Sequence, residues 1–367
     1  MGRLDHLAVY LSDSCNLACS YCYVAVNQSP ASRLTLEQVR RAVDEFCGAV
    51  PGPDRKVTFL GGEPLLDWKL FEGAARYARQ VGGPDMVLQT FTNGTLLTPE
   101  KAAVLNELDV HCTVSLDGKK ADNDLHRVYH KEKRRSVFED AMARLAPLDK
   151  SRLGVSLVFT AATVDRLLSN LEGFRALGFQ RMTFNPELYE VWPEEKLAVM
   201  RRALSGVARW YKALLDAGRA PQIQILFSVM ENLEANKSGV RWWHDCHNMV
   251  LGPDAQYYSC DKALSFPVGQ AADLRTGGAE KGMAWKARGE QLDDFVDWIE
   301  ERGGGDKEIF CPIGVVAHAR ESGRPPEAAL ANFRQVADAF ADGLSELVAL
   351  CGKHPAFEEM YGRARVV

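Results

Sequence analysis

Three cysteines stand within eight positions near the start of the chain: Cys15, Cys19 and Cys22. Thiolates at this spacing bind zinc or iron–sulfur clusters. A structural zinc site needs four ligands, and His6, the only imidazole nearby, lies in an apolar segment ahead of the cysteines. A cubane held by three thiolates leaves one iron with an open position. The spacing therefore favours an iron–sulfur cluster with room for a cofactor.

Polar and glycine residues that suit a bound cofactor follow three later apolar segments. They are Gly61, Gly62, Glu63, Asn93, Ser115 and Asp117. Glycine allows the backbone to approach a ligand closely, and a carboxylate accepts hydrogen bonds from an ammonium group. Each group alone is also typical of a glycine turn or a helix cap, so their placement in the fold decides their meaning.

The elements that must position these residues are strands alternating with helices. Extended-type apolar segments recur at 5–11, 57–62, 86–94, 110–118, 153–160 and 181–187, and helical periodicity separates them. This alternation predicts βα units around a parallel sheet. Six units are too few to close an eight-stranded barrel, so we expect an α/β fold with a partial (β/α)6 parallel barrel. Its chemistry should lie at the carboxyl ends of the strands, where the cysteines and polar residues fall.

The second half of the chain has a different pattern. A long amphipathic helix is predicted over 194–217, followed by a hairpin over 250–260 and a closing helix over 326–350. We expect a core domain at 1–219 and a smaller α+β domain at 220–367.

Cys15-x3-Cys19-x2-Cys22, with Tyr21 before the last cysteine, resembles the signature of the radical S-adenosylmethionine (radical SAM) enzymes. The residues at 61–64 resemble the GGEP element of that superfamily, and Asn93, Ser115 and Asp117 follow in its order. The resemblance implies a [4Fe-4S] cluster whose open iron chelates S-adenosylmethionine, which is then cleaved to a 5′-deoxyadenosyl radical. Arg127 matches the arginine that pairs with the cofactor carboxylate in relatives. The resemblance covers roughly residues 5–190.

A second set of cysteines follows in the later half: Cys246, Cys260 and Cys311. The run PDAQYYSC resembles the hairpin of SPASM and Twitch extensions, which bind auxiliary iron–sulfur clusters. Ala255 replaces the usual glycine there, and the dense group of cysteines that normally follows is absent. One auxiliary [4Fe-4S] cluster is therefore expected. A zinc site or three unrelated thiols remain the alternatives.

The fourth ligand of this second site stays open in the sequence. Cys351, His244, His247 or a substrate could complete it, or the fourth position could stay vacant. Cys47 and Cys112 lie in apolar helix and strand patterns and are interpreted as core residues.

An auxiliary cluster favours a net oxidation, because in relatives it accepts the electron left after hydrogen abstraction or binds substrate. Dehydrogenation or crosslinking of a peptide or protein side chain is the expected reaction. Asp261, Asp245 and Tyr258 are candidate bases for the accompanying proton, although support of the neighbouring cysteines is an alternative role. The enzyme alternative is a radical oxidoreductase for a small metabolite such as an amino sugar.

A non-enzymatic iron–sulfur module that senses redox state is a further alternative. It would need neither the GGEP element nor Arg127, so these residues count against it. The expected partners are a peptide or small-molecule substrate and a reductant such as flavodoxin or ferredoxin. The first strand begins by residue 6, so no leader-binding domain is expected ahead of it, and either a separate peptide-recognition protein or a cavity that recognises the target directly would select the substrate.

Composition limits the other partners. Lysine and arginine number 44 against 49 aspartate and glutamate residues, which gives a net charge of −5. This balance argues against nucleic acid and against an anionic membrane surface. No secretion signal and no run of eighteen apolar residues is present, so a cytoplasmic location is expected.

Overall fold

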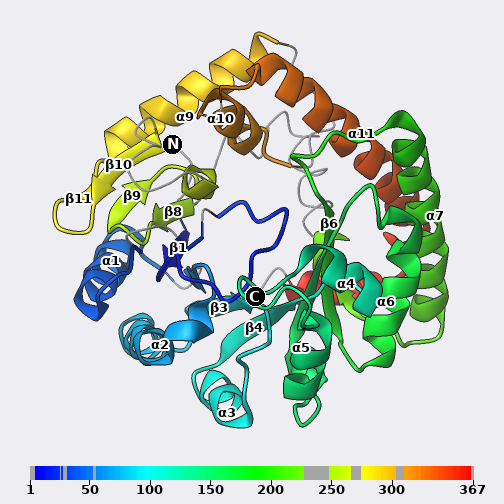
Figure 1. Cartoon of the computed structure of the whole chain (residues 1–367), viewed down its shortest axis with the longest axis horizontal. Helices are drawn as coiled ribbons and strands as arrows, with labels where there is room; N and C mark the ends of the chain where they lie inside the picture. Colours follow the sequence, from blue (N-terminus) through cyan, green and yellow to red (C-terminus); the bar gives the residue numbers. More distant parts are fainter. Residues whose placement is uncertain are drawn as a thin grey trace.

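The computed structural model describes residues 5–24, 26–27, 31–52, 55–226, 248–265, 274–302, 310–321 and 323–364. Its centre is a parallel sheet of consecutive strands, each hydrogen-bonded to the next. The strands are β1 (His6–Tyr10), β2 (Lys56–Leu60), β3 (Val87–Thr92), β4 (Val110–Ser115), β5 (Gly154–Phe159), β6 (Arg181–Pro186) and β7 (Gln222–Ile223). Helices surround the strands in Figure 1. The partial parallel barrel predicted from the sequence is confirmed.

Helices connect these strands along the chain. They are α1 (Leu36–Ala49), α2 (Trp68–Gly82), α3 (Pro99–Glu107), α4 (Lys120–His126), α5 (Val137–Leu145), α6 (Leu167–Ala176) and α7 (Glu194–Asp216). Four of these helices, α1, α2, α3 and α5, begin at a residue whose side chain caps the helix. Thr35 and Gln38 form a reciprocal capping box at the start of α1. Thr98 caps α3 ahead of a proline at the first helical position. Short 3₁₀ segments occur at Pro64–Asp67, Lys150–Arg152, Val164–Arg166 and Asp261–Ser265.

The later half extends the same sheet on the other side of β1. The strands are β8 (Asn248–Leu251), β9 (Gln256–Tyr258), β10 (Arg275–Gly278) and β11 (Gly282–Met283). β8 pairs in parallel with β1, and β8 to β11 pair with one another antiparallel. The predicted hairpin is confirmed. Ala255 lies in its turn at a φ of 60°, the left-handed conformation that usually favours glycine.

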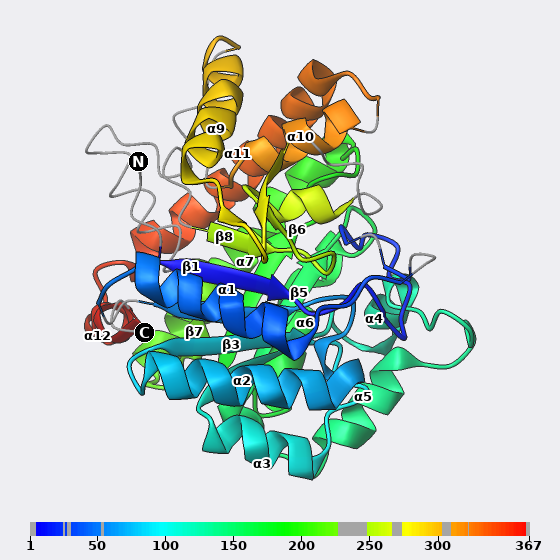
Figure 2. The same cartoon turned by 90° about the vertical axis from the view of Figure 1, so that its left-hand side faces the viewer.

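Four further helices follow: α9 (Trp285–Glu300), α10 (Ile313–Glu321), α11 (Pro326–Cys351) and α12 (Pro355–Ala364). Figure 2 shows α9 and α10 at one end of the molecule and α3 at the opposite end. Helix α11 packs along α7, and a Cβ on Gly343 would lie 2.5 Å from the side chain of Leu204. Helix α11 thereby joins the C-terminal elements to the barrel.

Two apolar clusters form the core. The main cluster lies between the barrel strands and their helices, and the second lies under β8, β9, α9 and α10. Helix α11 contributes Phe333 to the second cluster and Phe340 to the first. β7 belongs to the barrel sheet although it follows residue 219, so the domain boundary near 220 stays a prediction. Among the described residues, no helix is long and apolar enough to cross a bilayer.

Candidate active site

The cysteine loop follows β1 directly and is held in place by backbone hydrogen bonds. The amide of Ala18 donates to the carbonyl of Val128 at 2.8 Å, and that of Ser20 donates to the carbonyl of His126 at 3.0 Å. The side-chain oxygen of Asn27 accepts from the amide of Cys15 at 2.9 Å. The loop is therefore fixed against the segment that follows α4.

The three thiols of this loop are suited to binding a cluster. Burial raises the pKa of Cys15 and of Cys19, the latter to about 11, and the charge of Cys22 raises both further. Metal coordination would deprotonate these thiols by supplying the missing positive charge. In the part of the chain that the structure describes, no three histidine, cysteine or carboxylate side chains converge on one ion position. A cubane does not require such convergence, because its thiolates bind different irons.

Gly61 and Gly62 form the contact between the end of β2 and the cysteine loop. A Cβ on Gly62 would lie 2.3 Å from the carbonyl oxygen of Ser14, and one on Gly61 would lie 2.7 Å from that of Ser12. The amide of Gly62 also donates to the carbonyl of Ser12 at 2.8 Å. In this structure the two glycines allow backbone to pack on backbone.

Glu63 is buried, and its carboxylate accepts hydrogen bonds from neighbouring groups of the protein. One oxygen accepts from the hydroxyl of Thr92 at 2.7 Å and from the amide of Leu65 at 3.1 Å, and the other accepts from the amide of Asn93 at 2.8 Å. Burial raises the pKa of Glu63 against the lowering effect of these bonds. The side chain of Asn93 donates to Asn16 at 2.8 Å. These contacts connect the ends of β2 and β3 to the cysteine loop.

Asp117 and Arg127 form a buried pair beside the loop, and the half-buried Tyr21 lies against it. The guanidinium of Arg127 donates two hydrogen bonds to the carboxylate of Asp117, each at 3.0 Å. The hydroxyl of Tyr21 donates to the same carboxylate, and the Arg127 guanidinium lies 5.6 Å from the centre of the Tyr21 ring. Arg127 thus has a protein partner in Asp117. Ser115 lies half-buried at the end of β4.

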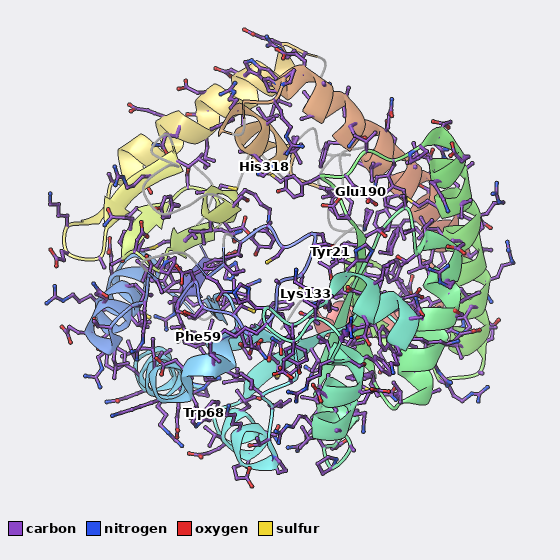
Figure 3. All side chains as sticks on the ribbon, in the orientation of Figure 1. Tyr21, Phe59, Trp68, Lys133, Glu190 and His318 are labelled. Carbon is purple, nitrogen blue, oxygen red and sulfur yellow. The ribbon has the colours of Figure 1, made fainter. Side chains whose placement is uncertain are left out.

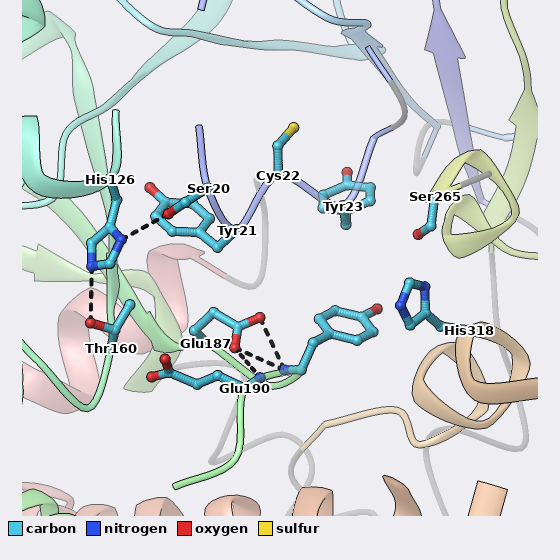
Figure 4. A pocket seen from close by; sticks show the side chains of 11 residues that line it. Ser20, Tyr21, Cys22, Tyr23, His126, Thr160, Glu187, Glu190, Ser265 and His318 are labelled. Atoms are coloured by element: carbon cyan, nitrogen blue, oxygen red, sulfur yellow. Dashed lines mark hydrogen bonds between the residues drawn. The ribbon is translucent and has the colours of Figure 1, made fainter. Parts of the chain in front are cut away.

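A cavity of about 320 Å³ opens beside the cysteine loop. Its lining residues are Ser20, Tyr21, Cys22, Tyr23, His126, Thr160, Glu187, Tyr189, Glu190, Ser265 and His318. Figure 4 shows the Cys22 sulfur on one side of this cavity and His318 with Ser265 at another. Tyr21, Glu190 and His318 lie inside the ring of helices in Figure 3. The cavity therefore has the barrel loops on one wall and C-terminal elements on the other.

The later cysteines divide into two places. Cys260 and Cys311 pack against the second apolar cluster, and the charge of Cys311 raises the pKa of Cys260 in addition to the larger effect of burial. Cys351 is fully buried in the main cluster at the end of α11. Cys246 and Asp245 lie outside the described residues. The thiols of Cys260 and Cys311 are thus neighbours, and Cys351 is not part of this group.

The two described base candidates have different surroundings. The carboxylate of Asp261 accepts from Lys262 at 3.1 Å and from the hydroxyl of Tyr10 at 3.4 Å. Burial raises its pKa, but Lys262 and the hydrogen bonds outweigh burial and hold the pKa below its ordinary value. The hydroxyl of Tyr258 donates to Asp254 at 2.7 Å in the hairpin turn. Asp261 is therefore held by Tyr10 and Lys262, whereas Tyr258 supports the hairpin.

Comparison with known proteins agrees with this geometry. Residues 9–186 match the sequence model of the radical SAM superfamily. These residues belong to the radical SAM superfamily. Membership implies a [4Fe-4S] cluster and S-adenosylmethionine as cofactors of this domain.

The radical SAM chain is also similar to individual proteins. It is 27% identical over 271 residues to a serine-type anaerobic sulfatase-maturating enzyme from Klebsiella aerogenes, covering 70% of this chain and 66% of that enzyme. It is 31% identical over 118 residues to an AdoMet-dependent heme synthase from Oleidesulfovibrio alaskensis, which covers 32% of this chain and 29% of that protein. The first relative is thus spanned over about two thirds of its length.

Solved structures show the same fold. The structure of anSMEcpe with bound AdoMet superposes with a TM-score of 0.68 at 18% identity, covering 98% of this chain and 99% of that one. Streptococcus suis SuiB bound to its precursor peptide SuiA superposes with a TM-score of 0.58 at 15% identity, covering 80% and 67%. The match to anSMEcpe extends through the C-terminal elements, so the radical SAM barrel and its extension share one known architecture.

Several residues at the site of this radical SAM chain were not predicted from the sequence. Lys262 is half-buried, pairs with Asp261 and lies 3.6 Å from the centre of the Tyr23 ring. The two ring nitrogens of His126 form hydrogen bonds with the hydroxyl of Ser20 at 2.8 Å and with that of Thr160 at 3.1 Å. The position of Lys262 directly after Cys260 and Asp261 was the available signal. His126 carried none, because its partners are distant in sequence.

Proposed function

We propose that this chain is a radical SAM enzyme that dehydrogenates a side chain of a peptide or protein. One observation carries the proposal: a single cavity has Cys22 of the cysteine loop on one wall and C-terminal residues such as His318 on another. Such a cavity can hold a cofactor next to the cluster loop together with a substrate group. The similarity to a sulfatase-maturating enzyme supports a protein side chain as the substrate.

The residue roles in this proposal follow their positions. Cys15, Cys19 and Cys22 would hold the [4Fe-4S] cluster, and Cys260 and Cys311 would contribute to one auxiliary cluster. When bound, S-adenosylmethionine and the reduced cluster supply the radical that abstracts a hydrogen atom. Tyr21, Gly61, Gly62, Glu63, Asn93, Ser115, Asp117 and Arg127 are proposed to shape the cofactor site. Most of these bind one another here, so we assign them mainly to its framework.

The oxidation also releases a proton and an electron. Asp261 is proposed to accept the proton, because its ion pair with Lys262 keeps the carboxylate ionised. The hydroxyls of Tyr23 and Tyr10 lie 2.7 Å apart, and Tyr10 donates to Asp261. Tyr23 lines the cavity, so these hydroxyls connect it to the carboxylate. The electron would pass to the auxiliary cluster next to Cys260.

Two measurements test the proposal. Anaerobically reconstituted protein with dithionite should convert S-adenosylmethionine to 5′-deoxyadenosine, and the triple change Cys15→Ala, Cys19→Ala, Cys22→Ala should abolish it. Cys47→Ala, on the outer helix α1, is the control that should keep activity. Cleavage by the triple variant would refute the assignment.

The second measurement identifies the substrate class. Peptides with a central cysteine or serine should lose two hydrogens in mass spectrometry when incubated with enzyme and cofactor. Oxidation of an amino sugar in place of every peptide would replace the proposal with the metabolite alternative. A requirement for an added peptide-recognition protein would show that a further partner presents the substrate. Replacing flavodoxin or ferredoxin with dithionite separates the choice of reductant from the chemistry.

A further inference from the structure

The cavity of about 320 Å³ beside the cysteine loop, where the oxidation is proposed to occur, is called the reactive cavity. A second cavity, of about 180 Å³, lies beside it. Apolar side chains supply most of its lining. They come from the connection between β6 and α7 and from the region of α10 and the start of α11, and they are Leu188, Val191, Val315, Pro325, Ala328 and Ala329. The volume suits one branched side chain and is too small for a helix or a cofactor.

The two cavities share a wall. Tyr189 and His318 line both of them. The rings of these residues meet edge to face, with centroids 4.9 Å apart. A chain that places one side chain in the reactive cavity can therefore place a nearby side chain in the second cavity by passing this pair.

The wall is held rigidly by hydrogen bonds. The carboxylate of Glu187 accepts from the amide of Tyr189 at 3.0 Å, and the indole of Trp192 donates to the carbonyl of Glu187 at 2.9 Å. The side chain of Asn332 on α11 donates to the carbonyl of Glu190 at 2.9 Å. The connection after β6 is thus tied both to itself and to α11. A site formed by such a loop exists before ligand binds, which lowers the entropic cost of binding.

Val191 marks the rim of the second cavity. It is 80% exposed, the largest value among the large apolar residues that the structure describes as exposed. An apolar side chain at the rim of an apolar hollow gains from a ligand that removes both from water. Most of the lining is apolar, so we expect an aliphatic side chain as its occupant. The charged residue Arg324 also lines the cavity, which suits an occupant attached to a polar backbone.

We propose that this second cavity is the subsite for an aliphatic side chain of the substrate peptide, about two or three residues from the residue that is oxidised. The inference rests on the proposed function, because it takes the reactive cavity as the place of oxidation. The two cavities are separated only by the wall of Tyr189 and His318, and an extended chain rises about 3.3 Å per residue, so the two side chains must be close in the peptide sequence. The subsite would thereby select the sequence around the target residue.

The experiment uses the reconstituted full chain and a displayed peptide library with a central cysteine or serine and random flanks. Sequencing of the members that lose two hydrogens should show leucine, isoleucine or valine enriched at one fixed offset. Replacing that residue with asparagine in a single synthetic peptide should lower kcat/KM by about 10- to 100-fold. If the lower kcat/KM comes from a higher KM with kcat unchanged, the aliphatic side chain contributes to substrate binding and not to the chemical step.

A matched pair of variants tests the cavity itself. Ala328→Phe, at an exposed lining position, should fill the subsite and shift the preference to glycine or alanine at that offset. Ala331→Phe, exposed on the same helix and outside the lining, should leave the preference unchanged. Both variants should produce 5′-deoxyadenosine as the wild type does.

The outcomes separate the two proposals. Oxidised peptides without a positional aliphatic preference, or an unchanged preference in Ala328→Phe, would overturn the subsite and leave the proposed function standing. A library in which no member is oxidised, although 5′-deoxyadenosine forms, would overturn the proposed function and the subsite with it.

Discussion

Arg127 donates from Nε to one carboxylate oxygen of Asp117 and from Nη2 to the other, both at 3.0 Å. The Arg127 side chain is 9% exposed and that of Asp117 is 1% exposed. The amide of Val158 also donates to the Asp117 carboxylate, at 3.1 Å. The pair therefore connects β4, the end of α4 and β5 behind the cysteine loop.

Arg127→Ala should destabilise the protein by about 3–5 kcal/mol, because it leaves the Asp117 carboxylate buried without its cation. Urea unfolding of the wild type and the variant measures the loss. Lys120→Ala is the control, since Lys120 and Glu139 form an exposed ion pair at 2.5 Å and its removal should change stability little. Equal unfolding midpoints for Arg127→Ala and the wild type would contradict a structural role for the pair.

Gly62→Ala should displace the cysteine loop, because the added Cβ would lie 2.3 Å from the carbonyl oxygen of Ser14. Since backbone atoms lie on both sides of this contact, the loop itself must shift. Iron content and the visible absorbance of the reconstituted protein should fall, and 5′-deoxyadenosine formation should fall with them. Both are measured on the same sample.

Gly48→Ala is the matched control for this change. Gly48 lies in α1, and nothing lies within 4 Å of an added Cβ. The substitution should keep the iron content and stabilise the protein by about 0.5–1 kcal/mol, as alanine does in a helix. A Gly62→Ala protein with full iron content would show that the loop tolerates the extra atom.

His6 gives the protein a pH-dependent stability. Its Nδ1 lies 2.6 Å from Oδ1 of Asn248 and its Nε2 lies 2.8 Å from Oγ1 of Thr58, so it joins β1 to β8 and β2. Burial and the neighbouring charge of Lys56 lower its pKa from 6.5 to about 3. A histidine with a lowered pKa contributes stability above pH 6.5, and this contribution is lost as the pH falls from about 6.5 towards 3.

His6→Gln removes this titration. The difference in unfolding free energy between wild type and variant should therefore shrink by about 1 kcal/mol for each pH unit below 6.5. Urea unfolding of the cluster-free protein at pH 7 and pH 5 measures it. His130→Gln, at an exposed position, is the control. Parallel stability curves for wild type and His6→Gln would show that His6 does not carry the dependence.

The sequence was sufficient to predict the barrel because its strands are apolar runs separated by segments of helical periodicity. The same property identified the cysteine loop as the continuation of the first strand. The parallel pairing of β8 with β1 was not predictable, because it joins residues more than 240 positions apart, such as His6 and Asn248. Helix α4 was also missed, since seven residues carry too little periodicity.

The sequence indicated which residues belong to the site, but it did not indicate which of them contact one another. Asp117 and Arg127 were both expected to face a cofactor, whereas the structure pairs them with each other. Glu63 likewise accepts its hydrogen bonds from Thr92, Asn93 and Leu65. A sequence names groups that are able to bind, but tertiary packing decides which partner each one meets. Lys262 shows the same limit, because only the fold places it on the Tyr23 ring.

The later cysteines give the last prediction. Phe310, the neighbour of Cys311 in the chain, stacks on Phe340 of α11 with ring centroids 5.4 Å apart, whereas Cys351 ends the same helix. Phe340 and Cys351 are 11 positions apart, which at 1.5 Å per residue separates them by about 16 Å along the helix. Cys351 is therefore too distant to complete a cluster held by Cys260 and Cys311.

The variant with Cys15, Cys19 and Cys22 changed to alanine should retain about four irons per chain, the content of one auxiliary cubane. Adding Cys260→Ala to it should remove that iron, and adding Cys351→Ala should not. Iron loss on the Cys351 change, with the protein still folded by circular dichroism, would place a ligand where the helix geometry excludes one.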